Sequence, residues 1–490
     1  MALPSVHREA YALAVDARDP RFDGVFFVGI TTTRVYCRPV CPSRVAYDHH
    51  RRFFDSAAAA ERAGFRPCLR CRPELAPGRT AVTAVSRLAQ AAAQRIAAGA
   101  LNGLSVADLA SELGVSERHL RRSLEREVGV SPLELAQTYR LLLAKRLLRD
   151  TDLPVTRVAY ASGFQSLRRF NAVFRARYGM PPSALRRAKT VARRSRSADS
   201  LRLTLAYRAP FAWDVLLTCL RRDALSGVEL VTRQRYARTV RIDGASGVVL
   251  VRNEPSAQHL VVEVSASLVP VLMPLIAGLR RVFDLDAEPA IVDAHLAQGG
   301  LGALVAGRPG VRLPGALDGF EVALRPLLGS APHVERVVQA FGEPLDTTVP
   351  GLTHLAPTAW RIADAGASAI AALGVPPRSA ESLAALARAV VSGTLRLSPG
   401  SDAEATWRGL LEINDISERQ AGRIVLRALS WPDALPAADP ALLVRAEQWR
   451  PWRAYAAVHL SLARSRQRVG TSTRKTSVRP DPFMSDVNIT

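Results

Sequence analysis

Four cysteines near the start of the chain have the types and spacing of a metal site. Cys37 and Cys41 form one pair, Cys68 and Cys71 form a second, and Cys219 is the one other cysteine in the 490 residues. Two such pairs are typical of a tetrahedral zinc ion held by four thiolates. A zinc-bound thiolate is deprotonated at neutral pH and is still a nucleophile. The spacing therefore predicts one zinc ion, and it leaves open whether the site is architectural or reactive.

The charge of the chain indicates a polyanionic partner. The formal net charge is +22 and the isoelectric point is about 11.0. Residues 79–189 concentrate the excess, with 19 Lys and Arg against 8 Asp and Glu. These basic residues follow helical patterns and do not form one run, so we expect a nucleic acid as the counterpart. A generally arginine-rich composition would explain part of the excess but not its concentration.

The composition also indicates a globular protein outside the membrane. Hydrophobic residues make up 48% of the chain, and the mean hydropathy is +0.04. The most apolar window, residues 260–279, contains Glu263, Pro270 and Pro274, which predicts a buried strand followed by a core helix. The first residues show no basic stretch followed by an apolar one. We therefore expect a cytoplasmic protein with no membrane association, in a reducing compartment that favours metal-bound thiolates.

Residues 1–78 contain the elements that must position the cysteines. A strand is predicted over 26–37, leading into the first pair, and a short helix over 57–65, between the pairs. The strings GITTTRVYCRPVC and AGFRPCLRCRPE closely resemble the N-terminal domain of the Ada adaptive-response protein, which repairs methylphosphotriesters in DNA. The resemblance implies one zinc ion on all four cysteines and makes Cys37 the methyl acceptor. It favours the reactive interpretation over the architectural one.

The charge of such a centre would couple repair to DNA binding. Four thiolates on one zinc ion make the centre doubly negative, and methylation of one sulfur makes it singly negative. The smaller charge repels DNA phosphates less, so methyl transfer should raise the affinity for DNA. Arginines near the cysteines in the sequence are candidate phosphate ligands. They are Arg34, Arg38, Arg44, Arg66 and Arg70.

Residues 80–190 are predicted to be a helical DNA-binding domain with an internal repeat. Residues 105–127 contain a helix, a turn at Gly114 and a basic helix after Ser116, and residues 154–187 repeat this layout around Gly163. The repeat strongly resembles the paired helix-turn-helix domain of AraC-type transcription regulators. The resemblance implies that the start of each second helix contacts DNA bases and phosphates. The candidate contacts are Ser116, Arg118, Arg121, Arg122, Gln165, Ser166, Arg168 and Arg169.

The second half of the chain follows a polar, basic linker at 191–200. Alternating apolar residues predict an antiparallel sheet with two helices over 201–285, and residues 286–463 are predicted to be mostly helical. The strings YRAPFAWDVLL and QWRPWRAYAAVHL are similar to 3-methyladenine DNA glycosylase II (AlkA), which implies a helix-hairpin-helix domain. A basic, disordered tail is predicted over 464–490.

The catalytic residues of a glycosylase are less well preserved than its fold. Asp439 follows Leu435 at the spacing that the resemblance implies for the catalytic acid, which supports loss of a flipped base. The hairpin turn at 414–417 lacks glycines, and Asp415 would repel the phosphate that such a turn binds. The positions implied to hold stacking aromatic residues are Cys219, Arg419, Arg423 and Ser461. We therefore expect weak or no base excision.

Together these patterns predict a multidomain, predominantly α protein. Its parts are a small α+β zinc domain, an all-α double helix-turn-helix domain, an α+β antiparallel-sheet domain and an all-α helix-hairpin-helix domain. The preferred interpretation is an alkylation-damage response protein, in which Cys37 irreversibly accepts a methyl group and the methylated protein activates repair genes. The alternative is a bifunctional regulator that also excises alkylated bases with Asp439, and a transcription factor with a structural zinc finger is third. The expected partners are double-stranded DNA and RNA polymerase, and we expect a monomer.

Overall fold

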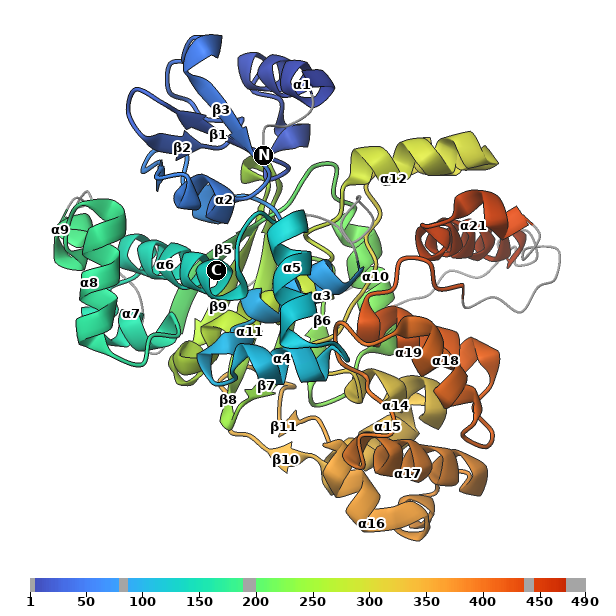
Figure 1. Cartoon of the computed structure of the whole chain (residues 1–490). Helices are drawn as coiled ribbons and strands as arrows, with labels where there is room; N and C mark the ends of the chain where they lie inside the picture. The colour runs from blue at the N-terminus through green and yellow to red at the C-terminus, as the bar shows by residue number, and fades with distance from the viewer. Residues whose placement is uncertain (1–4, 79–86, 188–199, 436–444, 473–490) are drawn as a thin grey trace, which may run out of the picture.

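The computed structural model describes residues 5–78, 87–187, 200–435 and 445–472. Figure 1 shows a small N-terminal unit at the top, a helical unit beside it, a central sheet, and an outer layer of helices in the C-terminal part. The predicted fold class, multidomain and predominantly helical, is confirmed. None of the described helices combines the length and the apolar character that crossing a bilayer requires.

The N-terminal unit is a four-stranded sheet with short helices around it. Its elements are α1 (Ser5–Asp16), η1 (Pro20–Phe22), β1 (Phe27–Ile30), β2 (Val35–Cys37), η2 (Asp48–His50), β3 (Arg51–Phe54), α2 (Ala57–Arg62), β4 (Arg66–Pro67) and η3 (Pro73–Leu75). The strand order is β3-β1-β2-β4, and β2 runs parallel to β4 while the other pairs are antiparallel. This parallel pair brings the two cysteine-containing segments to the same end of the sheet.

The segment predicted as one strand over 26–37 is a β-hairpin, so that prediction is wrong at its centre. The Arg34 N–H donates to the Ile30 carbonyl at 2.9 Å, and Arg34 has a left-handed φ of 54°. Folding back lets Phe27 and Tyr36 pack edge to face with ring centroids 5.7 Å apart. The packing of these aromatic side chains outweighs the extended preference of the threonines between them.

The second unit contains both predicted helix-turn-helix repeats. Its elements are α3 (Arg87–Ala97), η4 (Ala100–Asn102), α4 (Val106–Glu112), α5 (Glu117–Glu127), α6 (Pro132–Asp150), α7 (Val155–Ala161), α8 (Leu167–Tyr178) and α9 (Pro182–Arg187). Gly114 and Gly163 have φ of 69° and 83°, which opens the turns α4–α5 and α7–α8. The side chains of Ser116 and Ser166 cap the second helices. The long helix α6 joins the two repeats.

The central unit is a five-stranded antiparallel sheet with two main helices, as predicted. Its elements are β5 (Ser200–Ala206), α10 (Trp213–Asp223), β6 (Glu229–Val231), β7 (Arg235–Ile242), β8 (Ala245–Glu254), η5 (Pro255–Ala257), β9 (His259–Ser265), η6 (Ala266–Val271) and α11 (Leu272–Val282). The strand order is β5-β9-β8-β7-β6. The apolar window at 260–279 forms β9 and then η6 and α11, so the expectation of a buried strand and a core helix is confirmed.

The C-terminal unit is mostly helical, as predicted. Its elements are α12 (Pro289–Leu296), η7 (Ala297–Leu301), α13 (Gly302–Gly307), α14 (Glu321–Leu328), α15 (Ala331–Phe341), β10 (Glu343–Pro344), β11 (His354–Leu355), α16 (Ala359–Ala372), α17 (Pro377–Val391), α18 (Ala403–Leu411), α19 (Glu418–Leu429), η8 (Glu447–Trp449) and α21 (Arg453–Ser472). Helices α18 and α19 flank the turn at 414–417, where Asp415 has a φ of 63°. This pair is the hairpin that the sequence predicts.

The helix-turn-helix unit and the central sheet share one hydrophobic core. Leu147 of α6 and Phe170 of α8 belong to the same buried cluster as Leu203 of β5, Leu260 of β9 and Leu272 of α11. All are almost completely excluded from solvent. The two halves of the chain therefore pack as one body, although the linker predicted at 191–200 lies almost wholly outside the described residues.

The last helix extends into the segment that the sequence predicts to be a disordered tail. Helix α21 continues to Ser472, past residue 463, where the helical domain was expected to end. The residues of the predicted tail beyond 472 lie outside the described part of the chain.

Candidate zinc centre and DNA-binding surfaces

The four cysteines of the N-terminal unit meet at one point. Cys37 ends β2 and Cys68 directly follows β4, and the Cys68 N–H donates to the Tyr36 carbonyl at 2.9 Å. The Sγ atoms of Cys37, Cys41, Cys68 and Cys71 all lie within 4.8 Å of one another, and all four residues are buried. Four sulfurs at this separation match the ligand set of a tetrahedral zinc ion.

The electrostatics of the cluster also fit a cation. Hydrogen bonding to Cys41 raises the pKa of the Cys37 thiol far above its usual range. Hydrogen bonding from Cys37 lowers the pKa of Cys41 to about 6 and lowers the pKa of Cys68 still further. Thiols packed this closely compete for protons, so a doubly charged zinc ion is what allows all of them to be thiolates together.

Two of the sulfurs accept backbone hydrogen bonds. The Arg38 N–H lies 3.4 Å from Cys71 Sγ, and the Arg70 N–H lies 3.3 Å from Cys68 Sγ. Within the described residues, no backbone N–H bonds to Cys37 Sγ. The same is true of Cys41 Sγ. Because a hydrogen bond withdraws electron density from a thiolate, the sulfurs of Cys37 and Cys41 are the less attenuated nucleophiles.

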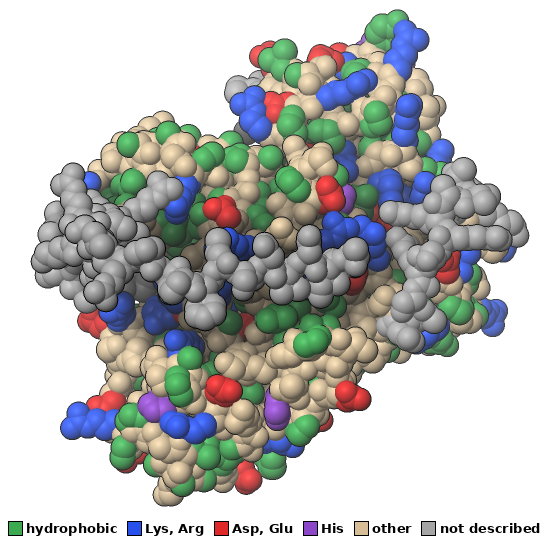
Figure 2. All heavy atoms as spheres, turned by 180° about the vertical axis from the view of Figure 1, so that it is seen from behind, with side chains coloured by type: hydrophobic (Ala, Val, Ile, Leu, Met, Phe, Trp, Pro, Cys, Tyr) green, Lys and Arg blue, Asp and Glu red, His purple; other side chains and the backbone are tan. Residues whose placement is uncertain are grey.

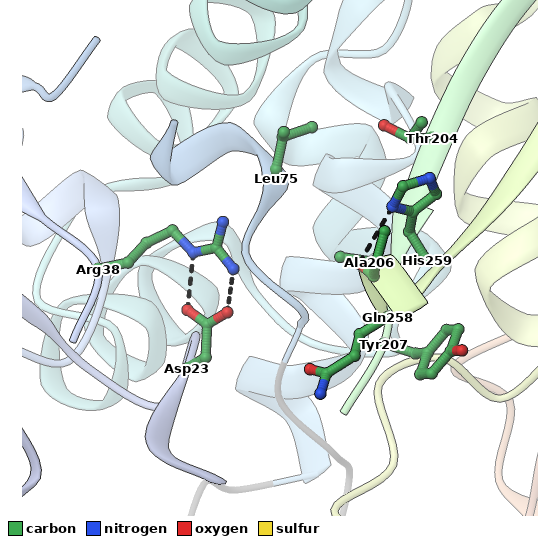
Figure 3. Close-up of a pocket in the computed structure, with 9 residues that line it drawn as sticks. Asp23, Arg38, Leu75, Thr204, Ala206, Tyr207, Gln258 and His259 are labelled. Carbon is green, nitrogen blue, oxygen red and sulfur yellow. Dashed lines mark hydrogen bonds and ion pairs between the residues drawn. The ribbon is translucent and has the colours of Figure 1, made fainter. Parts of the chain in front are cut away.

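The side chain of Arg38 is turned into the protein. Its guanidinium pairs with the carboxylate of Asp23 and donates to the Cys71 carbonyl at 3.1 Å (Figure 3). The Arg38–Asp23 pair lies on one side of a cavity of about 130 Å³, with Thr204 and His259 of the central sheet on the other side. The described lining of this cavity includes no cysteine, so the cavity is separate from the zinc centre. Arg38 thus fastens the Cys71 loop, and its predicted contact with DNA stays a prediction.

The other arginines predicted near the cysteines are exposed. Arg34 lies over the ring of Phe65, with its guanidinium carbon 5.6 Å from the ring centroid. Arg44 and Arg70, in loops, and Arg66, at the start of β4, are exposed to solvent. Figure 2, which views the molecule from behind, shows several basic side chains on the N-terminal unit at the upper right. The structure therefore leaves these four side chains accessible to a phosphate.

The predicted contacts in the first repeat lie at the start of α5. Ser116 caps the helix, and its hydroxyl accepts from the His119 N–H at 3.3 Å. Arg118 and Arg122 are exposed. Arg121 is bonded to Glu117 one turn earlier, at 2.6 Å. An exposed helix start with free guanidinium groups is the geometry that enters a DNA groove.

The second repeat presents a similar surface at the start of α8. Ser166 accepts from the Arg169 N–H at 3.3 Å, and the side chains of Arg168 and Arg169 are exposed. Gln165 donates to the Asn102 carbonyl at 3.2 Å, which ties this turn to η4 of the first repeat. Sequence analysis did not indicate that link, because the two residues are far apart along the chain.

A buried carboxylate that sequence analysis missed connects the zinc-binding unit to the helix-turn-helix unit. Glu61 of α2 accepts hydrogen bonds from the Tyr36 hydroxyl at 3.1 Å and from the Thr138 hydroxyl of α6 at 2.8 Å. Arg177 of α8 lies 3.1 Å from the same carboxylate. Burial raises the pKa of Glu61 even with these partners. The strand that ends at Cys37 is thus linked through one side chain to the second recognition helix.

In the glycosylase-like half, the residues at the positions that the resemblance implies for base stacking are not aromatic, and they lie in other environments. Arg423 of α19 lies 2.6 Å from Asp223 of α10, and Arg427 lies 3.4 Å from the same buried carboxylate. Cys219 is buried among apolar side chains. Arg419 and Ser461 are exposed. Asp439 lies outside the described residues, so its geometry is not part of the structure.

Comparison with known proteins connects these units to characterised families. The metal binding domain of Ada matches residues 10–74, a helix-turn-helix domain matches 109–188, and the AlkA N-terminal domain matches 202–318. The "Probable bifunctional transcriptional activator/DNA repair enzyme AlkA" of Mycobacterium tuberculosis is 36% identical over 474 residues, which cover 91% of this chain and 94% of that protein. This chain belongs to the family of bifunctional transcriptional activators and DNA repair enzymes.

Two further relatives each match one part of this chain. The DNA-3-methyladenine glycosylase 2 of Escherichia coli is 35% identical over 276 residues, 52% of this chain and 95% of that protein. The bifunctional transcriptional activator/DNA repair enzyme Ada of Escherichia coli is 33% identical over 138 residues, 27% of this chain and 36% of that protein. The prediction of a DNA-binding repair enzyme and activator is confirmed. One zinc ion held by the four cysteines agrees with both the family and the geometry.

Proposed function

We propose that Cys37 takes the methyl group of a DNA methylphosphotriester in a single-turnover reaction. The zinc ion, when bound, keeps the sulfurs deprotonated and nucleophilic at neutral pH. The thiolate of Cys37 attacks the methyl carbon, so that a carbon–sulfur bond forms and the carbon–oxygen bond of the ester breaks. The electron pair of that bond goes to the oxygen, which leaves an ordinary phosphodiester anion. No proton or further reactant is needed, and the thioether formed has no route back.

The observation that carries this proposal is the different hydrogen bonding of the sulfurs. Cys68 and Cys71 accept backbone N–H groups, which hold them as structural ligands. The described residues place no such donor on Cys37 or on Cys41, and of these two Cys37 is the one that the resemblance to the Ada domain makes the methyl acceptor, with exposed arginines near it in the sequence. A neutral methylphosphotriester flanked by anionic phosphates fits such a site, since the arginines bind the flanking phosphates and the thiolate meets the methyl group.

The proposed reaction changes how the protein binds DNA. Loss of one negative charge at the centre removes repulsion that amounts to about 1 kcal/mol for a phosphate near 4 Å in water, and more in a less polar surrounding. Arg34, Arg44, Arg66 and Arg70 would then hold the DNA backbone, together with the exposed arginines at the starts of α5 and α8. The methylated protein would thereby bind its promoters and activate repair genes.

We extend the proposal to the setting of the protein. Reactive thiolates need a reducing compartment, so we place the protein in the cytoplasm. RNA polymerase is the proposed partner for activation, since the relatives that match this chain are named transcriptional activators. We propose that it acts as a monomer, because the paired repeats already supply two recognition helices.

The experiment that tests Cys37 uses DNA that carries labelled methylphosphotriesters. The full chain is mixed with this DNA, and the labelled peptide is identified by mass spectrometry. We expect one methyl group per chain on Cys37, and none on the Cys37→Ser protein. Cys219→Ser is the matched control, since Cys219 is a buried cysteine away from the cluster, and it should take up methyl normally. A label on Cys41, Cys68 or Cys71 of the wild-type chain would overturn the assignment.

Base excision by the C-terminal half is the second candidate function. The 35% identity to DNA-3-methyladenine glycosylase 2 favours it. The ion pairs of Asp223 with Arg423 and Arg427 speak against it, because a cationic alkylated base would meet arginine side chains. Release of 3-methyladenine from alkylated DNA decides the question. We expect little or none; robust turnover that is lost in Asp439→Asn would establish the active glycosylase.

A further inference from the structure

We propose that Lys145 of the helix-turn-helix unit is a positioning residue of the zinc centre. Its ammonium fixes the loop that supplies two of the four thiolates, so the DNA-binding unit completes the surroundings of the methyl-acceptor site. This inference deepens the proposed function and rests on it where methyl transfer is concerned. Its contribution to zinc binding does not depend on which cysteine accepts the methyl group.

The contacts of Lys145 lead directly to a zinc ligand. Lys145 lies in the middle of α6, and its side chain has no exposed surface. The Nζ atom donates to the main-chain carbonyl of Cys68 at 2.9 Å and to Glu74 Oε2 at 2.6 Å. Glu74 follows the second cysteine pair, in η3. The ammonium of Lys145 therefore bonds both to Cys68, which provides a zinc ligand, and to η3, which follows the second cysteine pair.

The same loop is held from its other side by a group of the N-terminal unit. The Arg38 guanidinium donates to the carbonyl of Cys71, while the Lys145 ammonium donates to the carbonyl of Cys68. The carbonyls of the two ligand residues that bound this loop are thus each bonded to a cation, one from each unit. Outer contacts of this kind orient metal ligands, and removing them weakens metal binding about 10–100-fold.

The charge balance around Lys145 explains why it can be buried. Glu74 neutralises it at hydrogen-bond distance, and Arg72 joins Glu74 at 3.1 Å and Asp150 of α6 at 2.8 Å. A buried ammonium without such partners would be strongly destabilising. The alternation of cations and carboxylates leaves the thiolate centre as the nearest group whose charge changes during the proposed reaction. Lys145 is therefore placed to respond to that change.

The bond from Lys145 to Cys68 also connects the zinc-binding loop to helix α6. Helix α6 joins the two helix-turn-helix repeats and packs against η3 of the zinc-binding unit. A change in charge at the sulfurs alters the attraction between the Cys68–Cys71 loop and the Lys145 ammonium. The helix that carries both repeats is therefore bonded to the part of the molecule that methylation modifies.

The test replaces both members of the buried pair in the full chain. The double variant Lys145→Met with Glu74→Gln leaves no buried charge unpaired, which favours retention of the fold. We expect circular dichroism close to that of the wild type and zinc affinity about 10–100-fold lower in competition with a chromogenic chelator. In protein loaded with cobalt(II) in place of zinc, we expect the thiolate-to-cobalt absorption bands to shift. The single-turnover methyl-transfer rate should fall as well.

The matched control is Arg149→Gln. Arg149 also reaches this loop from α6, and it donates to the Leu69 carbonyl at 3.3 Å, but it does not touch a ligand residue. It should leave zinc affinity and the cobalt spectrum unchanged. Lys145→Arg, which keeps a cation opposite Glu74, serves if the double variant does not fold. It moves the donor away from the Cys68 carbonyl, so zinc affinity should fall and the cobalt bands should shift, by less than in the double variant.

Zinc affinity and a cobalt spectrum equal to the wild type in these Lys145 and Glu74 variants would overturn the proposal, even if they were less stable. That result would make Lys145 a packing residue of the interface between the units. If zinc binding falls as expected while methyl appears on another cysteine, the assignment of Cys37 fails and the role of Lys145 stands.

Discussion

Buried arginine–carboxylate pairs occur in both halves of this molecule, with opposite consequences. In the N-terminal unit, Arg38 pairs with Asp23 and bonds to the Cys71 carbonyl, which holds the ligand loop without occupying the site of the four sulfurs. In the C-terminal half, Asp223 pairs with Arg427 and with Arg423, and Arg423 stands at a position where the resemblance implies a base-stacking residue. A buried ion pair therefore supports chemistry when it fixes the reacting groups from outside, and it opposes chemistry when it occupies their place.

Of the changes that test this comparison, removal of a zinc ligand should have the largest effect, on the folding and activity of the N-terminal unit. We expect Cys68→Ser to lose the zinc ion, and with it most of a binding free energy that amounts to about 10–16 kcal/mol in small zinc domains. The N-terminal unit should unfold and methyl uptake should vanish. The measurements are zinc per chain by atomic absorption and proteolysis of residues 5–78.

The control for this change is Cys219→Ser in the C-terminal half. Cys219 packs among apolar side chains and is far from the cluster in sequence. One zinc ion per chain should remain. Zinc retained at full occupancy in Cys68→Ser would contradict a four-cysteine centre.

Breaking the ion pairs of Asp223 should have the next largest effect. Asp223→Ala leaves Arg427 buried without its carboxylate, and loss of one partner of a buried pair costs about 3–5 kcal/mol. Urea unfolding measures this loss. Asp214→Ala, at the exposed start of the same helix, should cost less than about 1 kcal/mol.

Asp223→Ala also tests whether the ion pairs of Asp223 are what prevents base excision. If Asp223→Ala created base-excision activity on alkylated DNA, the ion pairs would cover a site that is otherwise competent. We expect no excision, because Arg419 and Arg423 would still face an incoming cationic base.

Acid should weaken the C-terminal half through His459. Burial lowers the pKa of His459 to about 4, below its value near 6.5 in an unfolded chain. The unfolded state therefore binds a proton at a higher pH than the folded state does. The contribution of neutral His459 to stability is complete above pH 6.5, and it is lost as the pH falls from 6.5 to 4. Between pH 7 and pH 5 the loss amounts to about 2 kcal/mol.

His459→Gln removes this titration and serves as the comparison in urea unfolding at both pH values. The stability of the variant should fall less than that of the wild type by about 2 kcal/mol over this interval. The comparison with the variant matters because burial raises the pKa of Asp284 to about 6, which stabilises the fold as the pH falls. Equal losses in the two proteins would contradict a buried, neutral His459.

Single phosphate contacts should have the smallest effect. Arg122→Ala should weaken binding to all DNA sequences alike and reduce the slope of log affinity against log salt by about 1. Arg121→Ala should change the slope less, since its guanidinium is already bonded to Glu117. Fluorescence anisotropy over a salt series measures both. A change in sequence preference for Arg122→Ala would make it a base contact.

Local patterns predicted the parts of the molecule that local spacing determines. The pairs around Cys37 and Cys68 predicted the metal cluster, because each pair needs only a short loop to bring two sulfurs together. Ser116 and Gly114 predicted the start of α5, since capping and a left-handed turn are properties of neighbouring residues. These features do not depend on the rest of the fold.

Contacts between distant residues could not be predicted in this way. Glu61 stands in an alanine-rich helix and looks like an exposed residue, yet its partners Thr138 and Arg177 come from another unit. The turn of the hairpin at Arg34 was not predicted, because the threonines before it also favour extended strands. The ion pair of Asp223 with Arg423 joins residues of α10 and α19 that are about 200 positions apart, so no local pattern in the sequence predicts it.

The core shared by α6 and the central sheet also constrains synthesis. The regulator unit leaves the ribosome first, with Leu147 and Phe170 still lacking the strands that cover them. These side chains are fully enclosed only after β9 and α11 have been made and have docked. Helix α11 ends at Val282, about 95 residues after the regulator unit ends at Arg187, which takes several seconds at bacterial rates of elongation. A nascent chain that stalls in this interval would present an unfinished apolar face to chaperones. The glycosylase-like half thus completes the core of the DNA-binding half during synthesis.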